Sequence, residues 1–293
     1  MMRGLPVLLV CVACQRPPET PDGLDQSLRY LFGAFYGSDE EVSAGLSGLV
    51  DWYEDEGRGL LGESASLDNI GSFALEPLRQ EDVDAYAPRP DGDPATATGV
   101  IAVAELPCAW KRAERLLIRP DQDVVFTDFD FYERSYTTSR AAYDGARQEG
   151  EYVGIDAPFD LDALQATPEV LLLTENRTSG TEMGVTIPFD LHMHARHGRF
   201  SVADEEAQAG LYVTWMPERA EAEGGANTME QSYTFEVDLE WKGQTLWVYA
   251  SWAEVQTSVF ASDSTILMTA AANTAQDTAR RMADICTGDI VLD

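Results

Sequence analysis

The clearest hydrophobic pattern in the chain is a strict alternation over residues 233–241. The apolar odd positions are Tyr233, Phe235, Val237, Leu239 and Trp241, and the even positions between them are polar. Alternation with a period of two is typical of a β-strand with one buried and one solvated face. Lys242-Gly243 then predicts a tight turn, and the aromatic run 246–255 predicts the returning strand of a hairpin.

Other extended segments and one long helix are predicted around this hairpin. The extended segments are 100–104, 124–138, 170–174, 183–194 and 211–216. A short helix is expected from Pro107 to Leu117. Apolar positions three or four residues apart predict a long helix from Asp263 to Ile285, which Gly288 ends.

Two amphipathic helices are predicted near the start of the chain. The first follows residue 23, and the second begins at a capping box formed by Ser38 and Glu41. The Pro- and Gly-containing stretch 87–99 predicts a loop. We therefore expect a helical N-terminal segment over residues 24–98 and an antiparallel α+β domain with a C-terminal helix over residues 99–293.

The order of elements after residue 99 resembles the START-like, or helix-grip, superfamily. The resemblance depends on the opening run 100–107, on Trp110 in the first helix, and on a long final helix after a series of antiparallel strands. It implies an α+β fold with a curved antiparallel sheet around the last helix and an apolar cavity between them. The N-terminal helices and residues 138–170 lie outside the pattern. A β-sandwich or a lipocalin-like barrel is the alternative.

Residues 1–18, MMRGLPVLLVCVACQRPP, place a positive start before an apolar run that ends at Cys14. The run is too short to cross a bilayer, which takes roughly 20 residues. With small Ala13 before Cys14, the stretch resembles a bacterial lipoprotein signal, although Cys11 stands where that family usually has Leu. The alternative is a redox or metal-binding CxxC pair formed by Cys11 and Cys14.

The lipoprotein resemblance implies a signal peptide over residues 1–13, lipidation of Cys14 and a Pro-rich tether over residues 14–23. Gln15 is not Asp, which by the family's sorting rule favours the outer membrane, facing the periplasm or the exterior. We therefore expect a cell-envelope protein that contacts the membrane through its lipid anchor.

Charge narrows the possible partners. The chain has 51 acidic and 20 basic residues, a formal net charge of −31. Such a surface repels phosphate backbones and anionic headgroups, so neither nucleic-acid binding nor electrostatic docking on a membrane is expected. A saline environment also favours such a surface.

Cys108 and Cys286 are the two cysteines that remain after the signal region. Outside the cytoplasm an isolated pair tends to be oxidised, so a disulfide between them is predicted. Two buried thiols are the alternative.

All three histidines, His192, His194 and His197, fall within the sequence LHMHARH. On a strand, His192 and His194 share one face, and His197 could join them from a turn at Gly198 to hold Zn or Cu. The alternative is a solvated polar strand face, which the neighbouring Arg196 and Arg199 favour.

No familiar enzyme signature is present: the sequence lacks G-x-S-x-G, H-E-x-x-H, a Walker A loop and G-x-G-x-x-G. We expect a non-enzymatic lipoprotein without a cofactor that binds an apolar ligand or lipid. The candidate pocket residues are Trp215, Phe235, Trp247, Tyr249 and Met268, although plain core packing also explains them. The alternatives are a structural or partner-binding envelope lipoprotein without a cavity, and a metal-dependent enzyme that uses the histidines.

Overall fold

The computed structural model describes residues 18–58, 70–86, 92–119, 121–136, 171–182, 185–225, 227–257 and 264–292. Cys14, the predicted signal peptide and the first part of the predicted tether lie outside these residues. Within the described part of the chain, no helix combines the length and the apolar character that a membrane crossing requires.

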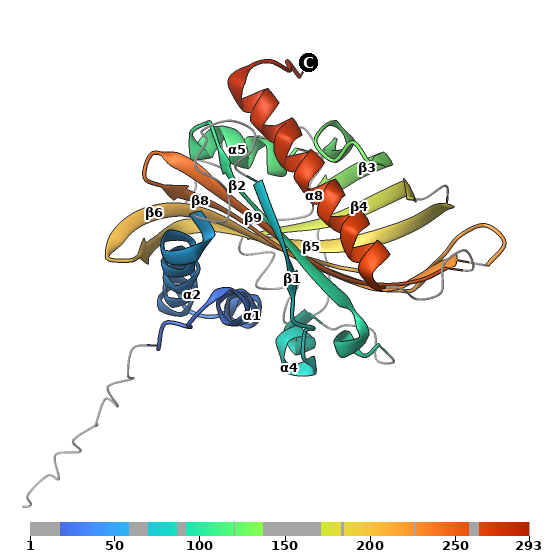
Figure 1. Cartoon of the computed structure of the whole chain (residues 1–293), viewed down its shortest axis with the longest axis horizontal. Helices are drawn as coiled ribbons and strands as arrows, with labels where there is room; N and C mark the ends of the chain where they lie inside the picture. The colour runs from blue at the N-terminus through green and yellow to red at the C-terminus, as the bar shows by residue number, and fades with distance from the viewer. Residues whose placement is uncertain are drawn as a thin grey trace, which may run out of the picture.

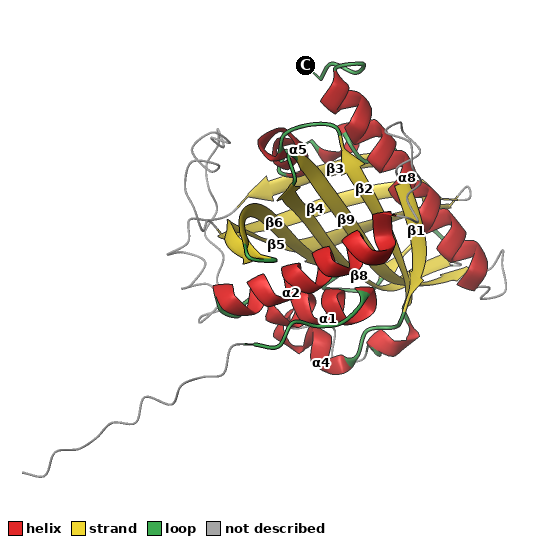
Figure 2. Ribbon diagram, turned by 60° about the vertical axis from the view of Figure 1, so that its left-hand side comes forward, coloured by secondary structure: helices red, strands yellow, loops and turns green. Residues whose placement is uncertain are grey.

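The described strands form one antiparallel sheet. The strands are β1 (Ile70–Leu75), β2 (Thr98–Leu106), β3 (Phe129–Tyr136), β4 (Leu171–Glu182), β5 (Val185–Val202), β6 (Glu205–Trp215), β7 (Ala220–Glu221), β8 (Asn227–Trp241) and β9 (Gln244–Thr257). Their order across the sheet is β1-β2-β9-β8-β6-β5-β4-β3, and β7 pairs with β8. Figure 2 shows that the sheet is strongly curved.

The predicted hairpin is confirmed as β8 and β9. Trp241 pairs with Gln244 across the turn, and Lys242 and Gly243 both take positive φ angles, of 49° and 84°. A two-residue turn of this kind matches the right-handed twist of the strands, and glycine adopts the required conformation without steric cost. The hairpin lies at the centre of the sheet, with β2 on one side and β6 on the other.

Helices cover both faces of the sheet. The helices are α1 (Leu24–Ala34), α2 (Asp39–Trp52), α4 (Gln80–Val83), α5 (Trp110–Leu117) and α8 (Ser264–Thr287), with shorter helical turns η1 (Tyr53–Gly57), η2 (Asp84–Tyr86), η3 (Pro94–Thr96) and η4 (Gln122–Val124). Figure 1 shows α5 and α8 on one side of the sheet and α1, α2 and α4 on the other. The sheet therefore lies between two helical layers.

The terminal helix is held on the concave side of the sheet. Arg281 on α8 donates from Nε to the carbonyl oxygen of Val124 in η4 at 3.1 Å, and Asp121 beside η4 forms an isolated β-bridge with Glu133 on β3. α8 also packs on β1, β2 and β9 (Figure 1). Both edges of the sheet thus approach the same helical layer, which confirms the predicted α+β fold with a curved antiparallel sheet around its C-terminal helix.

The N-terminal segment differs from the prediction in one respect. The capping box at α2 is present, with Ser38 accepting from the Glu41 amide and donating its own amide to the Glu41 carboxylate. However, the segment 24–98, expected to be helical, also contributes β1, which pairs with β2 from Ile70 to Leu75. The segment and the domain that follows share one sheet and one apolar core, because buried residues of α1 and α2 pack against β6, β8 and β9.

The prediction that one face of β8 is solvated is wrong at Glu236 and Asp238, although Glu240 on the same face is exposed. Glu236 and Asp238 on the even positions are buried, as are Phe235 and Val237 on the odd positions. The even face lies beneath α5 and the odd face lies against α1 and α2. Strand periodicity indicates which residues share a face, but it cannot indicate that a second helical layer covers the other one.

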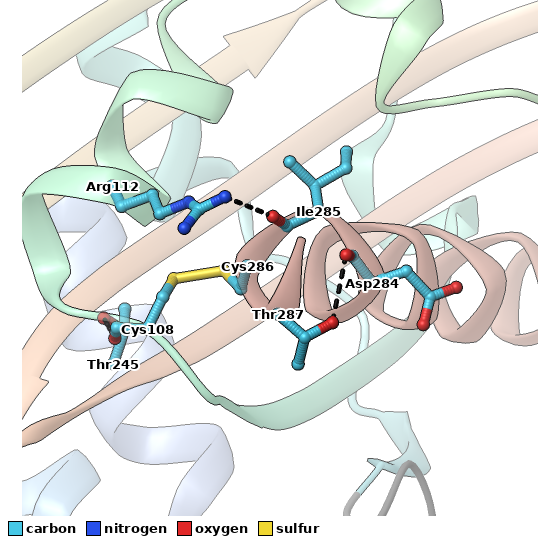
Figure 3. Close-up of a disulfide and its surroundings, with 7 residues drawn as sticks. All are labelled: Cys108, Arg112, Thr245, Asp284, Ile285, Cys286 and Thr287. Atoms are coloured by element: carbon cyan, nitrogen blue, oxygen red, sulfur yellow. Dashed lines mark hydrogen bonds between the residues drawn. A yellow bond between two sulfur atoms is a disulfide. The ribbon is translucent and has the colours of Figure 1, made fainter. Parts of the chain in front are cut away.

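The disulfide between Cys108 and Cys286 is confirmed (Figure 3). It joins the residues just before α5 to the last turn of α8, across a sequence separation of 178 residues. Arg112 on α5 adds a second link by donating from Nη2 to the Ile285 carbonyl oxygen at 2.6 Å. Loop-closure entropy for so long a separation gives the disulfide a stabilisation of up to about 5 kcal/mol.

Candidate functional site

The concave face of the sheet carries two adjacent rows of side chains that run across four strands. The first row is His197 on β5, Gly210 on β6, Asp238 on β8 and Trp247 on β9; the second is Ala195, Tyr212, Glu236 and Tyr249 on the same strands. Directly paired residues of an antiparallel sheet point to the same face. Both rows therefore face the layer that contains α5 and α8.

Helix α5 seals the first row. Trp110, its first residue, donates its indole N–H to the carbonyl oxygen of Asp238 at 3.0 Å. Glu114, one turn further along α5, places Oε1 2.6 Å from His197 Nδ1. Glu114 and Asp238 are fully buried, and His197 is 4% exposed. The structure thus collects charged and polar groups from α5, β5, β6 and β8 in a water-excluded region.

Gly210 leaves the room that this cluster needs. A Cβ atom at residue 210 would lie 2.6 Å from the hydroxyl oxygen of Tyr212 and would also overlap the carboxyl group of Asp238. Because real Cβ atoms do not approach other atoms so closely, glycine at this position lets both side chains occupy the space beside β6.

Burial changes the protonation of the two carboxyl groups on β8. It raises the pKa of Glu236 to about 7, against the opposing effects of the positive charge of Arg134 and of the Trp247 indole N–H, which donates at 2.6 Å. Burial also raises the pKa of Asp238 well above its usual value, and the nearby Glu114 and Glu236 carboxylates raise it further. Both groups therefore bind protons more tightly in the folded protein than in the unfolded chain.

Beyond these rows the concave face becomes accessible. Tyr249, Ser251 and Ala253 on β9, and Ser232 and Thr234 on β8, are only half-buried. These residues lie at the centre of the sheet, with neighbouring strands on both sides. On the opposite face of the same strands, Tyr233, Phe235 and Trp252 are at most 2% exposed. The helical layer therefore covers this part of the concave face incompletely.

An aromatic cluster lies beside the accessible part. Phe126 near η4 has its ring centroid 6.1 Å from that of Tyr249 and 6.4 Å from that of Phe129, and Phe129 is 6.3 Å from Phe189 on β5. Phe129, Phe189 and Tyr249 are only partly buried. Half-buried aromatic rings around a small-residue surface are the chemistry with which proteins hold apolar molecules.

The predicted pocket residues do not form one site. Trp215 and Phe235 belong to the core against α1 and α2, whereas Trp247 and Tyr249 lie on the concave face. Met268 is in α8, and its side chain lies outside the described residues. Of the five, only Tyr249 is shown at the accessible part of the concave face, and Trp247 stacks on it with centroids 5.6 Å apart.

The three histidines are also separated by the sheet. His192 and His194 share one face, as predicted, and each packs edge-on against Trp215. Tyr36 contacts Nδ1 of His194 from the α1–α2 side. His197 points to the concave face instead. In the described ranges, no three His, Cys, Asp or Glu side chains are arranged to hold a metal ion.

The sequence did not reveal Glu114, Tyr212, Glu236 or Asp238 as members of one cluster. The alternation of β8 placed Glu236 and Asp238 on one face, but it presented that face as solvated. Gly210 within an otherwise apolar strand was an available signal, because an isolated glycine in a strand often marks the close approach of another group.

Comparison with known proteins gives structural neighbours only. No family model and no curated protein matches the chain. A structure from Thermus thermophilus matches at 11% sequence identity over 66% of this chain and 99% of its own, with a TM-score of 0.39. A STAR-related lipid transfer protein from Xanthomonas axonopodis matches at 10% identity over 78% of this chain and 97% of its own, with a TM-score of 0.41.

Proposed function

We propose that this protein is an envelope lipoprotein, anchored through Cys14, whose α+β domain binds an apolar ligand or lipid against the concave face of its sheet. The accessible centre of that face carries the proposal. Tyr249, Ser251 and Thr234 stay half-buried where an ordinary core would be closed, as the same strands show on their other face. Leaving such surface partly uncovered costs stability, which an apolar ligand would restore by removing it from water.

Binding of the neutral fluorophore N-phenyl-1-naphthylamine tests the ligand site. We expect its fluorescence to rise with wild-type protein, and Ser251→Phe to weaken binding by about tenfold because the added ring occupies the half-buried surface. Gln256→Phe is the matched control, because it adds the same ring to an exposed position of the same strand. A lack of fluorophore binding, together with a lack of co-purified lipid in native mass spectrometry, would refute the ligand site.

A partner-binding lipoprotein without a ligand site is the alternative that such a result would favour. The metal-dependent enzyme receives no support from the described histidines, because His197 is on the opposite face from His192 and His194.

The anchor is tested separately. Replacing Cys14 by Ser removes the acceptor of the lipid, so we expect the variant to leave the membrane fraction while the wild-type protein stays there. Retention of the Cys14→Ser variant in the membrane fraction would show that another part of the chain holds the protein.

A further inference from the structure

Glu236 lies between the accessible part of the concave face and the sealed cluster beneath α5. It is 4% exposed, whereas Glu114 and Asp238 are fully buried. On β8 it is two residues from half-buried Thr234, and it pairs across the strands with half-buried Tyr249. Glu236 is thus the carboxyl group of the cluster that is nearest to the accessible surface.

The cluster contains three buried carboxyl groups, of Glu114, Glu236 and Asp238, and fewer basic side chains. Both carboxyl oxygens of Asp238, the hydroxyl group of Tyr212 and Nε2 of His197 are buried without a hydrogen-bond partner among the described residues. The basic side chains are Arg134 on β3 and His197 on β5. Arg134 already donates to the Leu117 carbonyl oxygen and to the Tyr132 hydroxyl. Buried carboxyl groups that outnumber the basic groups are costly to ionise, so a ligand that brings a positive charge and hydrogen-bond donors is favoured here.

We propose that the ligand is a long-chain amine, with its ammonium group held by Glu236 at the inner end of the site and its apolar chain along the half-buried part of β8 and β9. The inference rests on the proposed apolar-ligand function and specifies the head group. From Glu236 to Ser232 the strand rises about 13 Å, which gives the chain an extended apolar path beside Tyr249 and Ser251.

Charge separates an amine from the other common head groups. A fatty-acid carboxylate at the same place could bind only while Glu236 stays protonated, because an ionised Glu236 would repel it at close range. An ammonium group would instead form a charge-assisted hydrogen bond with Glu236. The net charge of −31 also raises the local concentration of cations around the protein.

Three probes with the same alkyl chain test the head group: dodecylamine, dodecanol and dodecanoate, each used to displace N-phenyl-1-naphthylamine from the intact protein. We expect dodecylamine to bind about tenfold more tightly than dodecanol, and dodecanoate to bind most weakly. Glu236→Gln should weaken dodecylamine about tenfold and leave dodecanol unchanged, because the amide still accepts from Trp247 and only the charge is lost.

Glu240→Gln is the matched control, because it removes the same charge from the same strand at an exposed position, where Glu240 accepts from Gln208 at 2.9 Å. We expect it to change dodecylamine binding less than twofold. Equal affinities for the three probes, or equal effects of the two substitutions, would overturn the amine assignment while leaving the apolar-ligand function intact. Failure of the fluorophore itself to bind would overturn both.

Discussion

The face of the sheet that packs on α1 and α2 is apolar and closed, whereas the concave face is polar near α5 and partly accessible near Thr234 and Ser251. Both faces are built from the same strands, so neighbouring residues of β8 belong to different environments. Phe235 is fully buried against Phe32 of α1, and Glu236 beside it is a buried carboxyl group with a raised pKa.

The difference between the two faces indicates that the closed apolar face provides most of the stability and that the concave face carries the proposed ligand site. A closed apolar face contributes free energy through burial and close packing. Buried carboxyl groups and half-buried central residues lower stability, and proteins tend to retain such features at functional sites. Substitutions on adjacent residues of β8 should therefore have different consequences.

The largest effect is expected from the closed face. Phe235→Ala should lower the free energy of unfolding by about 4 kcal/mol, because it removes a ring from a fully buried position and leaves a cavity. Thr234→Ala, on the next residue and the accessible face, should cost less than about 1 kcal/mol. Urea unfolding of both variants measures the two values, and similar losses would show that the two faces are equally closed.

A smaller effect, dependent on pH, is expected from the concave face. The pKa of Glu236 is about 7 in the folded protein and 4.5 as the ordinary value, so the folded state is favoured by proton binding at low pH. This stabilisation is present below pH 4.5 and is lost as the pH rises through about 7, with a total of about 3 kcal/mol.

Glu236→Gln should remove this loss, so its unfolding free energy should exceed that of the wild type by more at pH 8 than at pH 5. Urea unfolding at the two pH values measures the difference, and Glu240→Gln controls for the effect of net charge. A Glu236→Gln variant with the same pH dependence as the wild type would mean that Glu236 is not the group that titrates.

The fold was predictable to a large extent. Alternation over 233–241, the turn at Lys242-Gly243 and the helical spacing from Asp263 to Ile285 were local signals, and local signals determine single elements. The disulfide between Cys108 and Cys286 followed from the cysteine count. The strand β1 was missed because residues 70–75 carry little alternation and become a strand through pairing with β2.

The site was less predictable, because its residues meet only in the folded protein. Glu114 comes from α5, and no sequence spacing relates it to His197 or Asp238. The alternation of side chains along a strand could have predicted that His197 lies on the face opposite His192 and His194, because it is an odd number of residues from both. The turn expected at Gly198 concealed this, because β5 continues through Gly198 to Val202.

The order of the strands also has a consequence for the time course of folding. Thr98 on β2 pairs with Ala253 on β9, and among the described strands β1 pairs with β2 alone. The described strands β1 and β2 therefore join the rest of the sheet only after β9, in the last hairpin, has been synthesised. Contacts of such long sequence separation make folding slow, so the newly made chain remains open for longer than a chain of local hairpins would.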